Sequence, residues 1–137
     1  MSTPSHVLII TNDNGLRNLL EQIFIIRGDT TVIVRTIQDA EITTKRWELA
    51  MCRLVIIDTD ALGMGETEQK HMACRVLEDW TTKYPMLPFL FLGTLLQKYA
   101  LLTIRADIMQ FVVKPFHLDN LVDAIEDVCP LISSQTR

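Results

Sequence analysis

Five short runs of apolar residues recur along the chain, separated by longer stretches in which apolar positions follow helical spacing. The runs cover residues 7–10, 32–34, 54–57, 89–92 and 111–113. Each has the length of a strand and is rich in β-branched or aromatic residues. Because the runs are almost continuously apolar, both faces of the strands should be covered, which is typical of parallel strands between two layers of helices.

The intervening stretches predict five helices. The first is predicted because its apolar positions recur every three or four residues. It follows a turn-forming segment at residues 12–15 and ends at Gly28. A second is predicted over 37–51, a third before Tyr84, a fourth over 95–104 and a fifth before Pro130. The expected inward positions are Leu16, Leu19, Leu20, Ile23 and Phe24; Ala40, Trp47 and Ala50; Met72, Val76, Leu77 and Trp80; and Leu118, Leu121, Val122, Ile125 and Val128.

Strand and helix alternate five times, and parallel neighbours need a helix-length return that crosses over with a right hand. The sequence therefore predicts an α/β fold with three layers and a doubly wound, five-stranded parallel sheet. We expect residues 1–137 to form one domain with a core at about 7–129, and residues 1–6 and 131–137 to be tails.

Composition narrows the functional classes. The formal net charge is -4, with 13 basic and 17 acidic residues mixed along the chain, so no basic stripe is available to bind nucleic acid. No apolar run approaches the roughly 18 residues that span a bilayer, and we expect a cytoplasmic protein that does not bind membranes. Cys52, Cys74 and Cys129 are widely spaced and are expected to be reduced, mostly buried thiols.

Ligand and reaction sites in such sheets gather beyond the carboxyl ends of the strands. Asp58 directly follows the third apolar run and Lys114 follows the fifth. We expect these two runs to be adjacent strands that bring the carboxylate and the ammonium group to a shared, solvent-accessible rim. The two groups could form a plain ion pair, or Asp58 could be a nucleophile for phosphoryl transfer with Lys114 stabilising the phosphoryl oxygens. Asp60 is interpreted as a loop carboxylate.

The segments 54–58, 111–116 and 118–121 together resemble the pattern of a response-regulator receiver domain of the CheY-like superfamily. The resemblance covers about residues 7–129, and the Lys114-Pro115 step before the last helix is its most discriminating element. It implies a flavodoxin-like (βα)5 fold with a cis peptide bond at Lys114-Pro115. It also implies that Asp58 is the phosphoacceptor, Lys114 the phosphate partner and Phe111 the aromatic residue that changes rotamer on activation.

The sequence departs from the receiver pattern at three places, of which the third, Gly63 where the loop after Asp58 more often has proline, says little about chemistry. Receivers carry an acidic pair after the first strand that holds a magnesium ion, and here that pair aligns with Thr11 and Asn12. The sequence thus predicts at best a weak Mg²⁺ site formed by Asn12, Asp13 and Asp58, with helix capping as the alternative role of Asp13. The hydroxyl residue that receivers use after the fourth strand aligns with Gly93, which leaves Thr94 as a switch hydroxyl one position late.

Three functions stay open. The first is a phosphorylation-dependent receiver in a phosphorelay, phosphorylated on Asp58 from a sensor histidine kinase, and the second is a pseudo-receiver that binds signalling proteins independently of phosphate. A small flavodoxin-like enzyme or flavin carrier is the third. Beyond self-phosphorylation on Asp58 we expect no enzymatic activity. The predicted fourth helix is apolar nearly all the way round, so a face formed by the fourth helix, fifth strand and fifth helix could bind a partner or a second copy, or be covered by its own loops.

Overall fold

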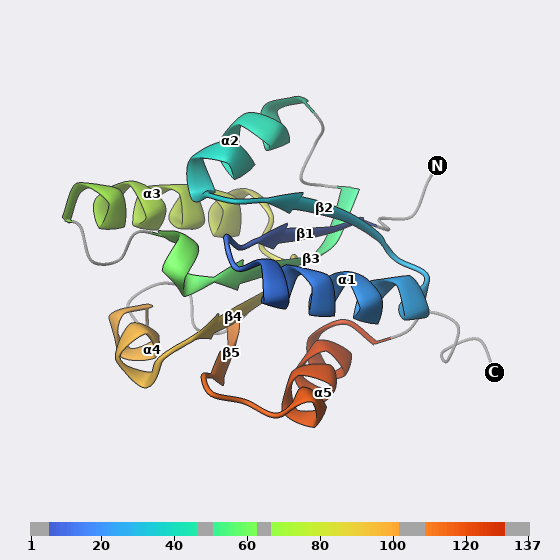
Figure 1. Ribbon diagram of the computed structural model, residues 1–137. Helices are drawn as coiled ribbons and strands as arrows, with labels where there is room; N and C mark the ends of the chain where they lie inside the picture. Colours follow the sequence, from blue (N-terminus) through green and yellow to red (C-terminus); the bar gives the residue numbers. More distant parts are fainter. Residues whose placement is uncertain (1–5, 47–50, 63–66, 102–108, 131–137) are drawn as a thin grey trace.

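The computed structural model describes residues 6–46, 51–62, 67–101 and 109–130. Five parallel strands form one sheet in the order β2-β1-β3-β4-β5, as Figure 1 shows. The strands are β1 (His6–Ile10), β2 (Thr30–Val34), β3 (Cys52–Asp58), β4 (Phe89–Gly93) and β5 (Met109–Val113). All five apolar runs are strands, so the predicted parallel, doubly wound sheet is confirmed.

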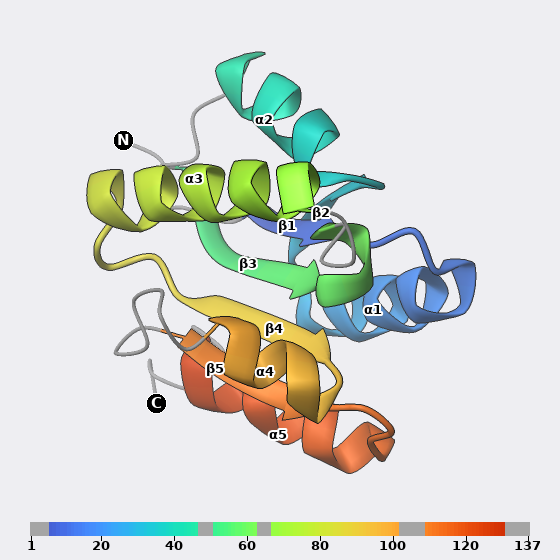
Figure 2. The same cartoon turned by 90° about the vertical axis from the view of Figure 1, so that its left-hand side faces the viewer.

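Helices cover both faces of the sheet. They are α1 (Asn14–Arg27), α2 (Ile37–Arg46), α3 (Thr67–Lys83), α4 (Leu95–Leu101) and α5 (Leu118–Val128), with the 3-10 helix η2 (Thr59–Leu62) directly after β3. Figures 1 and 2 show α1 and α5 on one side of the sheet and α2, α3 and α4 on the other. Across the described ranges, no helix combines the length and the apolar character that crossing a membrane would require.

Each face of the sheet carries its own hydrophobic core. Alternate strand residues such as Leu8 and Ile57 pack with Leu77 of α3 on one face, while Ile9 and Ile56 pack on the other face against α1 and α5. Nearly every residue of β1, β3 and β4 is buried. This two-sided burial explains why the sequence of these strands is continuously apolar instead of alternating.

The predicted ends of α1 are confirmed. Asp13 caps the helix through Oδ1, which accepts hydrogen bonds from the backbone N–H groups of Gly15 (2.9 Å) and Leu16 (3.1 Å). Gly28 ends it with φ of 83°, a left-handed conformation that glycine adopts without strain. The apolar positions predicted for this helix all lie in, or pack against, the core on its side of the sheet.

Two predicted helices extend beyond the described residues, and one predicted inward position is wrong. The helix predicted over 37–51 is described to Arg46, and Trp47 and Ala50 lie outside the described residues. Of the helix predicted over 95–104, α4 accounts for the part up to Leu101, and the rest also lies outside them. The inward position predicted for Leu118 is wrong, since its side chain is 51% exposed. Leu118 is the first residue of α5, and burial in the core begins three residues later, at Leu121.

A buried cluster of charges ties the end of α5 to the sheet. Arg27 and Arg53 both contact the carboxylate of Asp29, at 3.4 and 3.1 Å. Arg27 also donates to the carbonyl of Cys129, and Arg53 donates to the carbonyl of Pro130 at 2.8 Å. The arginines therefore satisfy carbonyl groups at the C-terminal end of α5 that have no partner within the helix.

The three cysteines are free thiols, as predicted. Cys52 and Cys129 are buried and Cys74 is half-buried. Burial raises the pKa of Cys52 to about 12, although a hydrogen bond with the backbone of Leu8 acts in the opposite direction. At neutral pH this thiol is therefore protonated and unreactive.

Candidate functional site

Asp58 ends β3 and lies at the carboxyl edge of the sheet, where its side chain is surrounded by hydrogen-bond donors. Its Oδ1 accepts from Lys114 Nζ at 2.8 Å and from the backbone N–H of Asp60 at 3.2 Å. Its Oδ2 accepts from the hydroxyl of Thr11 at 2.8 Å. Asp58 is only 1% exposed, so the expectation that its carboxylate meets solvent is wrong. The position at the rim is as predicted, but these donors cover the carboxylate.

The contact between Lys114 and Asp58 forms even though their strands are not adjacent. β4 lies between β3 and β5, so the predicted adjacency of the third and fifth runs is wrong. Consecutive crossovers of one hand place β4 beside β3 and β5 beside β4, and the long lysine side chain spans the intervening strand. The Lys114-Pro115 peptide bond is cis, as the resemblance implied.

Lys114 Nζ also lies 3.3 Å from Oδ2 of Asp60. Partial burial would lower the pKa of Lys114, but the hydrogen bond and charge of Asp58, followed by the charge of Asp60, raise it above its ordinary value. The pKa of Asp60 is lowered, first by a hydrogen bond from Gln97 Nε2 (3.0 Å) and then by the charge of Lys114. Asp60, interpreted from sequence as a loop carboxylate, is therefore part of this charged cluster.

Thr94 and Gln97 form a capping box at the start of α4. The hydroxyl of Thr94 accepts from the backbone N–H of Gln97 at 3.2 Å, and Oε1 of Gln97 accepts from the backbone N–H of Thr94 at 2.8 Å. This reciprocal pair is typical of a Thr-x-x-Gln helix start. Thr94 is exposed and its hydroxyl caps a helix in the arrangement seen here; its role as a switch hydroxyl stays a prediction.

Gln97 and Thr59 occupy the space beside Gly93. The Thr59 hydroxyl lies 3.2 Å from the Leu92 carbonyl and 2.5 Å from Gln97 Oε1, so its one proton has two acceptors within reach. A Cβ atom at Gly93 would lie 2.0 Å from Thr59 Oγ1 and 2.6 Å from Gln97 Oε1. The residue that ends β4 is thus glycine because neighbouring polar side chains fill the place where its side chain would stand.

The hydrogen bonds form a continuous chain around Asp58. From Asp58 the chain runs through Lys114 to Asp60, then through Gln97 to Thr59. It joins the carboxyl ends of β3 and β5 to the first turn of α4. Each polar side chain in it has its partner within the protein, an arrangement that favours one fixed geometry.

The magnesium ligands expected from the sequence do not form a site that fits the ion. Mg²⁺ needs oxygen ligands in octahedral geometry, with carboxylates preferred. Asn12 is exposed, Asp13 uses Oδ1 to cap α1, and both oxygens of Asp58 accept hydrogen bonds from the protein. Thr11 brings a hydroxyl proton, not a second carboxylate, to Asp58. Within the described ranges no cluster of three or more acidic, histidine or cysteine residues could hold a metal ion.

Phe111, the predicted switch aromatic, is half-buried in β5. Its ring stacks on that of Phe91, with the ring centroids 6.3 Å apart and the planes inclined by 5°. The pair extends the core that α2 and α3 cover. A rotamer change at Phe111 stays a prediction, and it would have to break this stacking.

Sequence reasoning missed three residues of the site: Thr11 as a donor to Asp58, and the pair Thr59 and Gln97. Two signals could have pointed to them. Thr11 stands where an acidic residue is expected next to the nucleophile, and Thr94-x-x-Gln97 is a capping-box pattern. The contact between Thr59 and Gln97 joins positions 38 residues apart, and a local pattern does not predict it.

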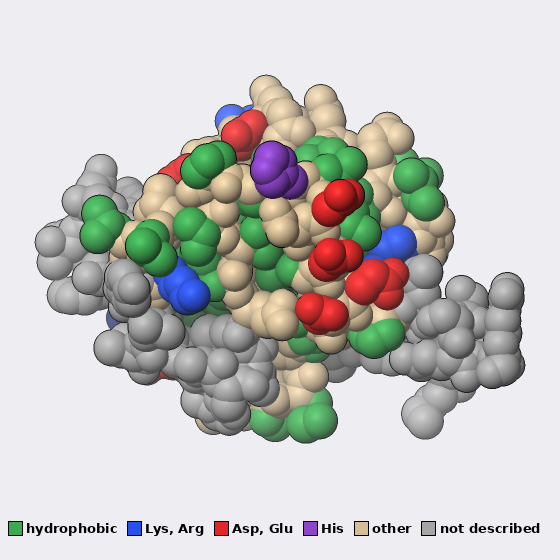
Figure 3. Space-filling view, turned by 90° about the horizontal axis from the view of Figure 1, so that it is seen from below, with side chains coloured by type: hydrophobic (Ala, Val, Ile, Leu, Met, Phe, Trp, Pro, Cys, Tyr) green, Lys and Arg blue, Asp and Glu red, His purple; other side chains and the backbone are tan. Residues whose placement is uncertain are grey.

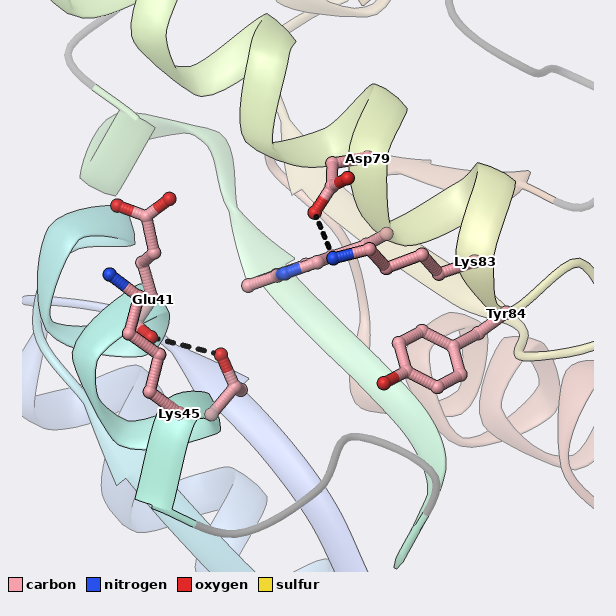
Figure 4. A pocket seen from close by; sticks show the side chains of 7 residues that line it. Glu41, Lys45, Asp79, Lys83 and Tyr84 are labelled. Atoms are coloured by element: carbon pink, nitrogen blue, oxygen red, sulfur yellow. Dashed lines mark hydrogen bonds and ion pairs between the residues drawn. The ribbon is translucent and has the colours of Figure 1, made fainter.

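Away from Asp58, a pocket of about 140 Å³ lies between α2 and α3. Figure 4 shows its lining of Glu41 and Lys45 from α2, with Asp79, Lys83 and Tyr84 at the end of α3. Asp79 and Lys83 pair at 3.3 Å. With two carboxylates and two ammonium groups around it, the pocket has no charge preference, and no chemistry is assigned to it.

No family model matches the sequence, and a search of curated proteins also found no match. Solved structures do match. The chemotaxis response regulator CheY4 of Vibrio cholerae aligns with 92% of this chain and 99% of its own, at 17% identity and a TM-score of 0.70. A CheY-like response regulator receiver domain protein from Methanospirillum hungatei JF-1 aligns over 98% of both chains, at 18% identity and a TM-score of 0.68.

NtrX from Brucella abortus aligns with 98% of this chain but with 28% of its own, at 18% identity and a TM-score of 0.69. The matched region is therefore a small part of that longer protein. All these identities are low, and what they establish is the fold. The predicted flavodoxin-like (βα)5 fold is confirmed.

Proposed function

From the fold of a receiver domain and the geometry around Asp58, we propose that this chain is a pseudo-receiver. It is a signalling module that binds other proteins and is not switched by phosphorylation. Such a module works in the cytoplasm beside its signalling partners. In this proposal Asp58 and Lys114 hold the carboxyl edge of the sheet together and do not take part in group transfer.

The observation that carries the proposal is the state of Asp58. A carboxylate that attacks a phosphodonor needs a free oxygen and a cation to draw the donor to it. Asp58 is buried, and its two oxygens are held by Thr11, Lys114 and the backbone N–H of Asp60. The side chain of Thr11 replaces negative charge with a donor at the place where a metal ligand is needed.

A phosphorylation-dependent receiver is the second candidate. The observation that favours it is the 2.8 Å contact between Lys114 Nζ and Asp58 Oδ1. In this alternative a sensor histidine kinase supplies the phosphoryl group, Asp58 accepts it and a weak Mg²⁺ site forms when Asn12 or Asp13 moves. Thr94 and Phe111 then carry the switch.

The interaction face proposed for the module is formed by α4, β5 and α5. Leu95, Leu96 and Leu118 are 49%, 83% and 51% exposed on this side of the molecule. Large apolar side chains exposed on neighbouring elements are typical of a surface that another protein covers. A signalling protein or a second copy of the chain could occupy it.

A phosphoryl mimic tests the proposal. Magnesium and beryllofluoride would be added to isotope-labelled protein while the amide signals of Asp58, Thr94 and Phe111 are followed by NMR. The pseudo-receiver is expected to show no shift at millimolar magnesium. Metal-dependent shifts at these three residues in the wild type would establish the second candidate in its place.

Two variants act as controls. Thr11→Asp combined with Asn12→Asp restores the acidic pair, so a response in this variant alone would identify the missing charges as the reason for the silent wild type. Asp58→Asn replaces the carboxylate with an amide that does not accept a phosphoryl group, so any shift that persists in it does not come from modification of Asp58. Both variants are first compared with the wild type by their amide spectra to establish that they are folded.

A further inference from the structure

Within the proposed interaction face, the outer edge of β5 borders a groove. β5 is the last strand of the sheet, so only β4 pairs with it among the described strands. The groove, of about 340 Å³, runs between β5 and α5. The apolar residues that line it are Phe111, Val112, Val113, Pro115, Phe116 and Ala124.

The backbone of β5 offers hydrogen-bonding groups to this groove. The N–H of Lys114 points to the carbonyl of Gly93 in β4, at 2.7 Å. Successive residues of a strand direct their backbone groups to alternate sides, so Phe111 and Val113 direct theirs away from β4. An edge of this kind is a template for one more strand, and β5 carries no charged side chain to block it.

The rim of the groove on α5 is acidic. Asp123 and Asp127 line it and are exposed, and within the described ranges neither forms an ion pair. Figure 3 shows the molecule from below, the side on which Figure 1 has α5 and β5, and acidic side chains gather on one part of this face. A chain that enters the groove therefore meets apolar side chains, backbone groups that point away from β4, and the negative charge of the α5 rim.

We propose that the β5–α5 groove binds an extended, basic segment of a partner protein, which adds a strand to the edge of β5. Its backbone pairs with Phe111 and Val113, its apolar side chains contact the groove, and its lysine or arginine side chains face Asp123 and Asp127. The inference rests on the proposed interaction role of the module and names the chemistry of its partner. Binding by strand addition takes its strength from the backbone and its selectivity from alternate side chains.

Charge favours this occupant over a second copy of the chain. Two copies that met through their β5 edges would bring two acidic rims together, and each copy carries a net charge of -4. Like charges at an interface suppress association, whereas a basic segment gains from the same rim.

The test uses a blocked peptide of alternating lysine and valine, about as long as one strand. With the intact chain it is expected to shift the amide signals of Phe111 and Val113 and to slow their hydrogen exchange. Asp123→Asn and Asp127→Asn should each weaken binding by about two- to fivefold, as loss of a rim charge does. Asp119→Asn is the matched control, because Asp119 lies on the same helix but does not line the groove.

Two further peptides separate charge from strand pairing. A peptide with glutamate in place of lysine should not bind, and the lysine peptide with N-methylated central amides should lose binding although its charge is kept. Equal binding of the N-methylated peptide, unchanged binding to the Asp123 and Asp127 variants, or a dimer formed through β5 would each overturn the proposal. Because the phosphoryl-mimic experiment contains no peptide, its result stands apart from this one.

Discussion

Gly93→Ala is the substitution that tests the packing at the site most directly. The new Cβ would lie 2.0 Å from Thr59 Oγ1 and 3.1 Å from Thr59 Cβ. Ordinary contacts between such atoms begin at about 3.4 Å, so the Thr59 hydroxyl would have to move away by more than about 1 Å. Thr59 is fully buried and held by its bonds to Leu92 and Gln97.

The expected cost follows from two contributions. Overpacking in a dense interior costs about 1–3 kcal/mol, and loss of the Thr59 hydrogen bond adds about 1 kcal/mol. We therefore expect Gly93→Ala to lower the free energy of unfolding by about 2–4 kcal/mol. Thr59→Ala alone should cost about 1 kcal/mol, because it removes the hydroxyl but leaves the Gln97 amide bonded to the backbone of Thr94.

Urea unfolding of the wild type, both single variants and the double variant forms a complete cycle. With the Thr59 hydroxyl absent, Gly93→Ala should cost about 1–2 kcal/mol less than it does in the wild type. Gly15→Ala is the control, since its Cβ would meet only Asp13 Oδ1, at 3.3 Å, and alanine is favoured over glycine in a helix such as α1, so no loss of stability is expected. A stable Gly93→Ala variant, or strictly additive costs, would refute the packing described at the end of β4.

Two other predictions concern charge and thiol chemistry. Because the pKa of Lys114 is raised by Asp58 and Asp60, the stability it contributes is complete below the ordinary lysine pKa and is lost as pH rises through the raised value. Melting temperatures measured against pH should thus fall at alkaline pH less steeply in Lys114→Met than in the wild type, and parallel curves would contradict the pairing. The folded protein should react with a thiol reagent at Cys74 while Cys52 stays protected at pH 8, because burial raises the pKa of Cys52 to about 12; rapid modification of Cys52, read by mass spectrometry, would contradict its burial.

The strands could be predicted from sequence because their chemistry is local. A run such as residues 54–57 is apolar at every position, and only burial on both faces of a parallel sheet accounts for that. The start of α1 was equally clear, since Asp13 precedes a regular apolar stripe and does cap the helix. The end of that helix was predicted by Gly28, whose positive φ is a local property.

The site itself depends on contacts between distant segments. Asp58 and Lys114 were recognised because each directly follows a strand, but their adjacency was wrongly attributed to neighbouring strands, since strand order depends on the crossovers and not on the runs. Asp58 is covered in part by Thr11, which lies 47 residues away in the sequence. In the sequence alone, Thr11 cannot be told from any other polar residue of a turn. Leu118 kept the helical period and is nevertheless exposed, because periodicity gives the direction of a side chain but not what lies opposite it.

The arginine cluster beneath the last helix restrains one end of that helix. Asp29, Arg27 and Arg53 hold the carbonyls of Cys129 and Pro130 at one end of α5, while the other end begins just after the cis bond next to Lys114. α5 is therefore held at its C-terminal end by charged side chains, in addition to the apolar contacts of Leu121 and Ile125 with the core. The restraint lies at the far end of the helix from Pro115 and Phe116, so a protein that binds the β5–α5 groove would meet these two residues where, within the described ranges, no such arginine contact holds the chain.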